Sequence, residues 1–196
     1  IKGPVKENQT VITDGRLSQY VSGMMMAASR LNGTTTIKLT DTKETPFLNM
    51  TKLWLESLGV NLSVSQDYKT ITVTGPTDYK AFDRPIPSDW EAVAFPLVAA
   101  LITNSSIVIK NVDTSGSQGD SAIVDVLKSF GADIQYNGSD LIVRGGKLAS
   151  NGNGRLVIPG GEAHINISGY PDAICALAVA ACFTEGTLFI EDAAVC

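Results

Sequence analysis

Histidine and cysteine are scarce in this sequence of 196 residues, which has one histidine and three cysteines. The cysteines come late in the chain and none forms a C-x-x-C pair, which excludes a disulfide framework and argues against a zinc site. Cys175 and Cys182 lie seven residues apart in an apolar stretch, so we expect both on the buried face of a helix. His164 has no second histidine with which to form a metal pair. We therefore expect no bound metal.

The sequence also lacks an excess of positive charge and a long apolar run. Its 15 lysines and arginines stand against 20 aspartates and glutamates, and the net charge of -5 argues against a nucleic-acid or anionic membrane partner. Every apolar stretch is interrupted before it could cross a bilayer, and the first residues, Ile1 to Pro4, form no secretory segment. We therefore expect a cytoplasmic protein that binds neither nucleic acid nor membrane.

What the sequence does have is a repeated pattern of helices and strands, in a chain with enough apolar residues (44%) to bury a core. The first copy predicts helix, strand, helix and hairpin at residues 18–31, 34–40, 47–58, 60–65 and 70–74. The same order recurs at residues 90–102, 106–111, 120–130, 133–136 and 141–144, and a third copy begins at 172–183 and 187–191. This alternation predicts layered α/β units, with the nearly uncharged first helix of each copy inside and the sheets outside.

The clearest candidate for a domain boundary is the stretch at residues 75–87, which has three prolines and shows little hydrophobic periodicity. Proline and glycine at this density favour a connection between domains over a helix or a strand. We therefore divide the sequence into residues 1–85 and residues 86–196.

The stretch from Asp14 to Tyr20 leads from an Asp-Gly turn into the first apolar helix. Free backbone N–H groups and the positive end of the helix dipole attract an anion at such a terminus. Ser18 and Gln19 would add side-chain donors there, and Arg16 would add a full positive charge. The alternative is that Ser18 only caps the helix, because serine is a preferred N-cap residue.

Five short motifs resemble those of one enzyme family. In chain order they are Leu-Ser-Gln-Tyr at residues 17–20, Pro-Phe-Leu-Asn-Met-Thr at 46–51, Ser-Asp-Trp at 88–90, Gln-Gly-Asp at 118–120 and Pro-Asp-Ala at 171–173. Their order and spacing are similar to those of the 5-enolpyruvylshikimate-3-phosphate synthase (EPSP synthase) family of enolpyruvyl transferases. The resemblance implies two lobes, each built from three βαβαββ units. Residues 1–85 would be the last unit of one lobe, and residues 86–196 the first unit and part of the second unit of the other.

The resemblance also implies a reaction, the transfer of the enolpyruvyl group of phosphoenolpyruvate to the 5-hydroxyl of shikimate 3-phosphate. It implies no metal or organic cofactor, small-molecule substrates and a monomeric parent enzyme. By motif, Ser18 and Gln19 would bind the substrate, Ser18 its phosphate, and Asp172 would take the proton of the attacking hydroxyl. From the residues alone, Asp172 could equally be the N-cap of the third helix. The family's basic Lys-Glu-Thr/Ser-Asp-Arg motif would begin just after Cys196, so we expect this central fragment to be inactive alone.

Three positions depart from the family pattern. Leu17 stands where the family has the first of two serines, Glu44 where a further serine contacts the phosphate, and Phe47 where a tyrosine packs near the substrate ring. A carboxylate beside a phosphate would repel it by on the order of 1 kcal/mol or more in a partly solvated cleft, unless Thr45 takes the serine's place. Two alternatives therefore stay open. One alternative to the shikimate 3-phosphate enzyme is a related enolpyruvyl transferase with another acceptor, such as UDP-N-acetylglucosamine, and the other is a non-catalytic α/β repeat domain.

Overall fold

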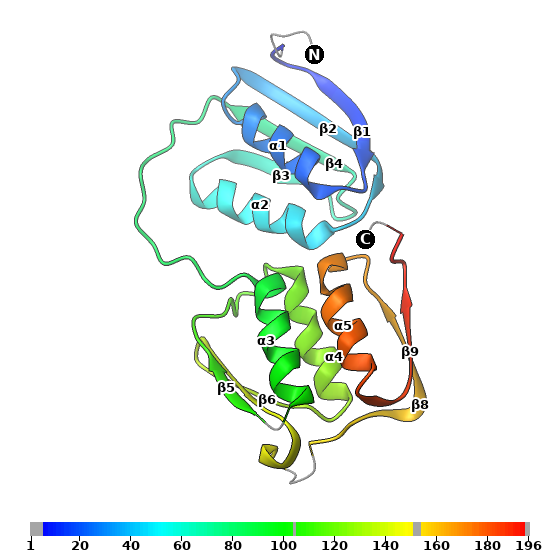
Figure 1. Ribbon diagram of the computed structural model, residues 1–196. Coiled ribbons are helices and arrows are strands. Elements are labelled where there is room, and N and C mark those ends of the chain that lie inside the picture. Colours follow the sequence, from blue (N-terminus) through cyan, green and yellow to red (C-terminus); the bar gives the residue numbers. More distant parts are fainter. Residues whose placement is uncertain (1–5, 104, 151–153, 195–196) are drawn as a thin grey trace. The chain divides into compact units, whose positions relative to one another are not determined.

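Two units, Ile1–Arg84 and Pro85–Cys196, make up the computed structural model, which describes residues 6–103, 105–150 and 154–194 (Figure 1). The junction between the units lies in the proline-rich stretch at residues 75–87. The assignment of residues 1–85 and 86–196 to two lobes of a larger fold stays a prediction.

The first unit is a four-stranded sheet with two helices on one face (Figure 1). Its elements are β1 (Thr10–Gly15), α1 (Ser18–Ala28), β2 (Gly33–Thr42), α2 (Thr45–Ser57), β3 (Asn61–Val64) and β4 (Thr70–Gly75). The strand order is β1-β2-β4-β3, with β1 parallel to β2 and β4 antiparallel to both of its neighbours. Both helical crossovers run in the same direction across the sheet, so the right-handed rule places α1 and α2 on the same face. The unit is therefore one complete βαβαββ repeat.

The core of the first unit follows from two periodicities. Alternate residues of β2 and β4 face the helices, and α1 and α2 each turn one apolar stripe toward them. The buried members of this cluster are Val21, Met25, Ala28, Ile37, Leu39, Leu48, Leu55, Val60, Ile71 and Val73. These residues hold the start of α1 and the loop before α2 in fixed positions on the sheet.

Strand β1 is not predicted by the sequence, because Asp14 and Gly15 indicate a turn. In the structure both residues belong to β1, and a Cβ on Gly15 would lie 2.6 Å from the carbonyl oxygen of Asp41. Glycine is therefore required here by the close approach of two backbones. That approach coincides with the bulge at which the pairing register of β1 and β2 shifts.

The second unit combines three α-helices with two small sheets (Figure 1). Its elements are α3 (Trp90–Ile102), β5 (Ser106–Ile109), the 3₁₀ helix η1 (Gly119–Ala122), α4 (Ile123–Ser129), β6 (Asp133–Asn137), β7 (Asp140–Arg144), η2 (Gly146–Leu148), β8 (Leu156–Asn166), η3 (Pro171–Ala173), α5 (Ile174–Ala181) and β9 (Thr184–Glu191). β5, β7 and β6 form an antiparallel sheet in that order, and β8 pairs in parallel with β9. The second predicted copy and the start of the third are thus present.

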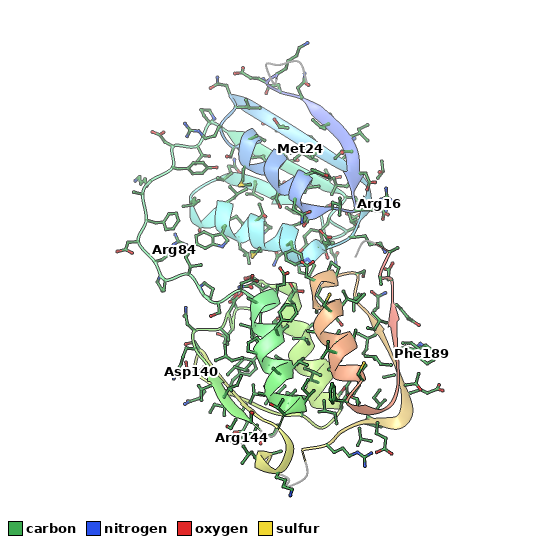
Figure 2. All side chains as sticks on the ribbon, viewed as in Figure 1. Arg16, Met24, Arg84, Asp140, Arg144 and Phe189 are labelled. Atoms are coloured by element: carbon green, nitrogen blue, oxygen red, sulfur yellow. The ribbon has the colours of Figure 1, made fainter. Side chains whose placement is uncertain are left out.

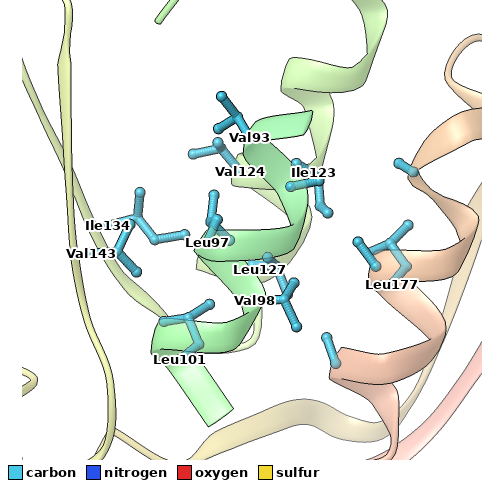
Figure 3. Close-up of a cluster of buried hydrophobic side chains, with 14 of the residues drawn as sticks. Val93, Leu97, Val98, Leu101, Ile123, Val124, Leu127, Ile134, Val143 and Leu177 are labelled. Carbon is cyan, nitrogen blue, oxygen red and sulfur yellow. The ribbon is translucent and has the colours of Figure 1, made fainter. Parts of the chain in front are cut away.

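Helix α3 forms the centre of the second core (Figure 3). Seven of its 13 residues are buried, and the side chains of Trp90 and Leu97 are fully covered. The surrounding cluster comes from α4, α5, β6 and β7 and includes Ile123, Val124, Leu127, Ile134, Val143 and Leu177. This packing fixes the start of α3 relative to η1 and η3.

The prediction that the first helix of each copy lies inside its unit holds best for α3, in which seven of 13 residues are buried, although α3 also exposes Phe95. α1 exposes Met26 and α5 exposes Val179, because the neighbouring elements of each unit cover one side of these helices only. The buried stripe of α5 is Ala176, Leu177 and Ala180. Cys175 and Cys182 lie on its other side and are exposed, so the expectation that they are buried is wrong.

Candidate functional site

The start of α1 holds a buried hydrogen-bonded pair. Ser18 is the first residue of the helix and is 4% exposed. Its backbone N–H and its Oγ–H both donate to Oε2 of Glu44, at 2.9 and 2.7 Å. The N-cap position belongs to Leu17, whose side chain makes no capping hydrogen bond. The alternative in which Ser18 only caps α1 is therefore wrong, because Ser18 is the first helical residue and binds a carboxylate from the loop before α2.

The backbone of Glu44 directs its side chain toward α1. Glu44 immediately precedes α2 and adopts a left-handed conformation (φ 50°, ψ 33°) that is uncommon for a residue other than glycine. Its side chain is buried, so the structure places a negative charge at the N-terminal end of α1, where the helix dipole favours an anion. The alternative in which Glu44 turns away and Thr45 takes its place is not what the structure shows.

Arg16 (Figure 2) and Gln19 flank Ser18 closely in the sequence, and both are exposed. The Nε and Nη2 atoms of Arg16 lie 2.7 and 2.6 Å from Oδ2 of Asp14. The hydrogen bonds from Arg16 lower the pKa of Asp14, and the same pair raises the pKa of Arg16. The structure therefore brings Ser18 and Glu44 together and leaves the side chains of Arg16 and Gln19 at the surface.

Four carboxylates gather in the second unit where α3, η1 and η3 pack on one another. Asp89 caps α3 by accepting a hydrogen bond from the N–H of Glu91 (3.1 Å), Asp120 belongs to η1, and Asp172 belongs to η3. The charge of Asp172 is the main cause that raises the pKa of Glu91, ahead of burial and the charge of Asp89. Asp172, the predicted proton acceptor, is exposed and stands at the start of the segment that leads into α5.

Asp120 is the buried member of this acidic group, with 3% of its surface exposed. Within the described part of the chain, its Oδ1 is the one buried side-chain oxygen or nitrogen without a hydrogen-bond partner. Burial, followed by the charge of Asp172 and then by the charges of Glu91 and Asp89, raises the pKa of Asp120 to about 6. No role for Asp120 was predicted from the sequence, although its place in the Gln-Gly-Asp motif was the signal that could have identified it.

Gln118 joins η1 to the start of α3. Its Oε1 accepts a hydrogen bond from the backbone N–H of Trp90 (2.8 Å), and its Nε2 donates to the carbonyl of Ser88 (3.1 Å). The indole N–H of Trp90 donates in turn to the carbonyl of Asp113 (2.8 Å). These partly or fully buried contacts hold Asp120 beside the first turn of α3.

Residues 6–103, 105–150 and 154–194 contain neither a candidate metal-binding group nor a candidate membrane-spanning helix. No three histidine, cysteine, aspartate or glutamate side chains in that part of the chain are arranged to hold a metal ion. None of its helices combines the length and the apolar character of a membrane span.

Solved structures define the class of protein. The fold matches an EPSP synthase from Acinetobacter baumannii with a TM-score of 0.68 and 20% identity, over 94% of this chain and 40% of that one. It also matches the enolpyruvyl transferase NikO from Streptomyces tendae with a TM-score of 0.60 and 16% identity, over 92% of this chain and 44% of that one. The fold is that of the enolpyruvyl transferases.

The chain belongs to the EPSP synthase family, since residues 2–196 match the family model of EPSP synthase (3-phosphoshikimate 1-carboxyvinyltransferase). A 3-phosphoshikimate 1-carboxyvinyltransferase from Ruminiclostridium cellulolyticum is 33% identical over 186 residues, which are 95% of this chain and 41% of that enzyme. Another, from Acetivibrio thermocellus, is 31% identical over 186 residues, with the same coverage. The resemblance inferred from five motifs is confirmed, and the chain spans about two fifths of the length of these relatives.

Proposed function

We propose that the full-length protein transfers the enolpyruvyl group of phosphoenolpyruvate to the 5-hydroxyl of shikimate 3-phosphate. The observation that carries this proposal is the match of residues 2–196 to the EPSP synthase family. The present chain would be a central part of that enzyme, which we propose to be a monomeric cytoplasmic protein with small-molecule substrates. We propose that the chain alone is inactive, because it spans only about two fifths of the length of its relatives.

In this reaction one C–O bond forms and another breaks. The acceptor hydroxyl oxygen bonds to the phosphate-bearing carbon of phosphoenolpyruvate, and the bond from that carbon to the phosphate oxygen breaks. The hydroxyl proton goes to the exposed carboxylate of Asp172 and finally leaves with the inorganic phosphate. A carboxylate within hydrogen-bond reach of the hydroxyl is what general base catalysis requires. Ser18, Gln19 and Arg16 would bind the acceptor.

A second candidate is an enolpyruvyl transferase of the same fold that uses a different acceptor. The contact between Ser18 and Glu44 favours it, because the two donors that would bind a phosphate already bind a carboxylate. An acceptor without a phosphate at this position would leave that contact intact. Shikimate and UDP-N-acetylglucosamine are therefore included as test acceptors beside shikimate 3-phosphate.

Phosphate release from phosphoenolpyruvate tests the proposal. The assay uses the full-length protein and the 196-residue chain with each of the three acceptors. We expect turnover with shikimate 3-phosphate by the full-length protein and none by the chain alone. Asp172→Asn should lower the rate by roughly 100-fold or more, since general base catalysis contributes about that much. Asp140→Asn, which changes a partly buried carboxylate paired with Lys110, should not lower it. Turnover with another acceptor only would replace the first candidate by the second, and turnover by the chain alone would contradict the site assignment.

A further inference from the structure

A second contact joins α1 to α2 one helical turn beyond Ser18. The hydroxyl oxygen of Ser22 lies 2.8 Å from Oγ1 of Thr51, in a partly buried position. Oγ1 of Thr51 also donates to the carbonyl of Phe47, four residues earlier in α2, at 3.1 Å. A threonine hydroxyl has a single proton, which the bond to Phe47 uses. Ser22 is therefore the donor in its contact with Thr51.

These hydrogen bonds continue to Glu44. The backbone N–H of Phe47 donates to the carbonyl of Glu44 (3.0 Å), and the Glu44 side chain accepts from Ser18. Ser18 and Ser22 are four residues apart in α1, so both lie on the same face of that helix. The contacts between the two helices thus close into a hydrogen-bond ring, which consists in order of Ser18, Glu44, Phe47, Thr51 and Ser22.

The ring holds Glu44 at both ends of the residue. Glu44 is the N-cap of α2 and has a left-handed backbone conformation (φ 50°, ψ 33°). A residue with a Cβ keeps such a conformation only where the surrounding contacts enforce it. Ser18 binds the side chain of Glu44, and Phe47 binds its carbonyl. Thr51 and Ser22 connect Phe47 back to α1 and so complete the support.

Packing of the helices does not by itself require hydroxyls at positions 22 and 51. Buried apolar residues of α1 and α2, among them Val21, Met25 and Leu48, already supply the hydrophobic contact of this unit. Replacing two hydrogen-bonded polar groups by apolar groups of the same shape costs little stability or none, because their net contribution is small. What the hydroxyl pair adds is direction, since it fixes the position of α1 along α2.

We propose that Ser22 and Thr51 are positioning residues that hold the carboxylate of Glu44 on Ser18 and so make the acceptor site select against a phosphate. The proposal rests on the proposed function, in which Ser18 binds the acceptor. A phosphate can accept from the two donors of Ser18 only after the carboxylate has left them. The carboxylate leaves more easily when the ring is open, because the first turn of α2 then has one contact fewer with α1. Ser22 and Thr51 act through Glu44 and do not touch the acceptor.

Calorimetric titration of shikimate 3-phosphate and of shikimate in the full-length protein tests this role. Thr51→Val keeps the shape of the side chain and opens the ring. We expect it to change the ratio of the two affinities by about threefold in favour of shikimate 3-phosphate, the factor that corresponds to a weak net hydrogen bond. Thr51→Ser keeps the hydroxyl and should retain the wild-type ratio. Thr34→Val is the matched control, because it removes a hydroxyl that pairs with Thr74 (3.0 Å) across β2 and β4.

A double-variant cycle separates positioning from a general loss of stability. Glu44→Ser leaves no carboxylate for the ring to hold, so adding Thr51→Val to it should not change the affinity ratio further. The proposal is overturned if Thr51→Val alone keeps the wild-type ratio. It is also overturned if Thr51→Val has the same effect with and without Glu44, or if Thr34→Val changes the ratio equally.

The amide proton of Ser18 reports on the ring without any acceptor. In full-length protein labelled with nitrogen-15 serine, an N–H that donates to a carboxylate resonates downfield of one that faces water. We expect Thr51→Val to move the Ser18 resonance upfield, toward its position in Glu44→Ser, and Thr34→Val to leave it in place. A resonance that Thr51→Val does not move would overturn the proposal. If the protein binds neither acceptor, the proposed function fails, while the Ser18 resonance still decides whether the ring holds Glu44.

Discussion

Replacing Glu44 by serine, the residue of the family pattern, should free the two donors of Ser18 at the start of α1. The change removes the carboxylate that binds the N–H and the Oγ–H of Ser18 at 2.9 and 2.7 Å. A serine hydroxyl ends closer to its own backbone than a glutamate carboxylate does, so it cannot reach Ser18 from the same backbone position. Two buried donors then lack an acceptor until water or a ligand supplies one.

Two opposing effects on free energy follow from this change. Without ligand, each lost hydrogen bond to a charged group is worth about 1.5–3 kcal/mol and entering water recovers part of it, so we expect the free energy of unfolding to fall by about 2–4 kcal/mol. With ligand, a phosphate that accepts from Ser18 no longer meets a like charge. At about 4 Å, two unit charges repel by about 4 kcal/mol at an effective dielectric constant of about 20 and by about 1 kcal/mol in water. We therefore expect Glu44→Ser to bind shikimate 3-phosphate at least about tenfold more tightly, equivalent to about 1.4 kcal/mol.

Calorimetric titration of shikimate 3-phosphate and of shikimate measures this change in the full-length protein. Shikimate should bind wild type and Glu44→Ser almost equally, because it carries no phosphate to be repelled. Glu44→Gln keeps the length of the side chain and one acceptor oxygen, so it separates the loss of charge from the opening of the site. Glu56→Gln, on the same helix, removes a charge that is exposed and paired with Lys52 (2.9 Å), and it should change neither affinity.

The reasoning is refuted if Glu44→Ser leaves the ratio of the two affinities unchanged. In that case the carboxylate either moves aside for the phosphate without measurable cost, or the phosphate binds elsewhere. A loss of stability with an unchanged ratio would assign Glu44 a structural role only. The protein would then be an ordinary shikimate 3-phosphate enzyme despite the replaced serine.

Two further predictions concern the stability of variants in the second unit, and a glycine in the first unit provides the control for one of them. The pKa of Asp120 is about 6 in the fold against 3.8 as the ordinary value, so the folded state binds its proton more tightly. The contribution of Asp120 to stability is therefore largest below about pH 4 and is lost as the pH rises through 6. Urea unfolding should show Asp120→Asn more stable than wild type at about pH 7.5 by up to about 3 kcal/mol, from a difference of about 2.2 at about 1.36 kcal/mol per pH unit, with no gain near pH 4. Gly145→Ala should lower the free energy of unfolding by about 1–3 kcal/mol, since the added Cβ would lie 1.9 Å from the carbonyl oxygen of Ala100. Gly23→Ala, in α1 with open space around the added Cβ, should instead raise it by about 0.5–1 kcal/mol.

Secondary-structure elements were predicted correctly where caps, apolar runs or turn residues within the element itself determine them. The helix expected at residues 90–102 is found at Trp90–Ile102, because Asp89 caps it and an unbroken apolar run follows. The hairpin of β6 and β7 follows from its Asn-Gly turn, in which Gly138 has a positive φ (59°). β1 was missed because Gly15 serves a contact with a strand more than twenty residues away, and no window of the sequence contains that contact.

The site was predictable to a smaller degree, since its contacts join residues that are distant in the sequence. Serine is a residue type typical of helix N-caps, which explains the local prediction for Ser18. Its partner Glu44, however, is 26 residues away and comes within reach only when α2 packs beside α1. The five motifs identified the candidate site segments because each motif is a short run of neighbouring residues in the sequence. The motifs did not reveal that a carboxylate already occupies the donors of Ser18, which depends on tertiary packing.

Two buried carboxylates, Glu44 and Asp120, lie in surroundings that are unfavourable for the free energy of the fold. Glu44 adopts a left-handed backbone conformation that most residues avoid, and Asp120 faces negative charges without a hydrogen-bond partner on Oδ1. Sequence rules describe what lowers the free energy of the fold, so they fail at residues kept for another reason. Hence the stability that Asp120→Asn should gain at neutral pH measures what the fold loses by burying this charge, and a variant without that gain would show that the charge of Asp120 costs the fold nothing.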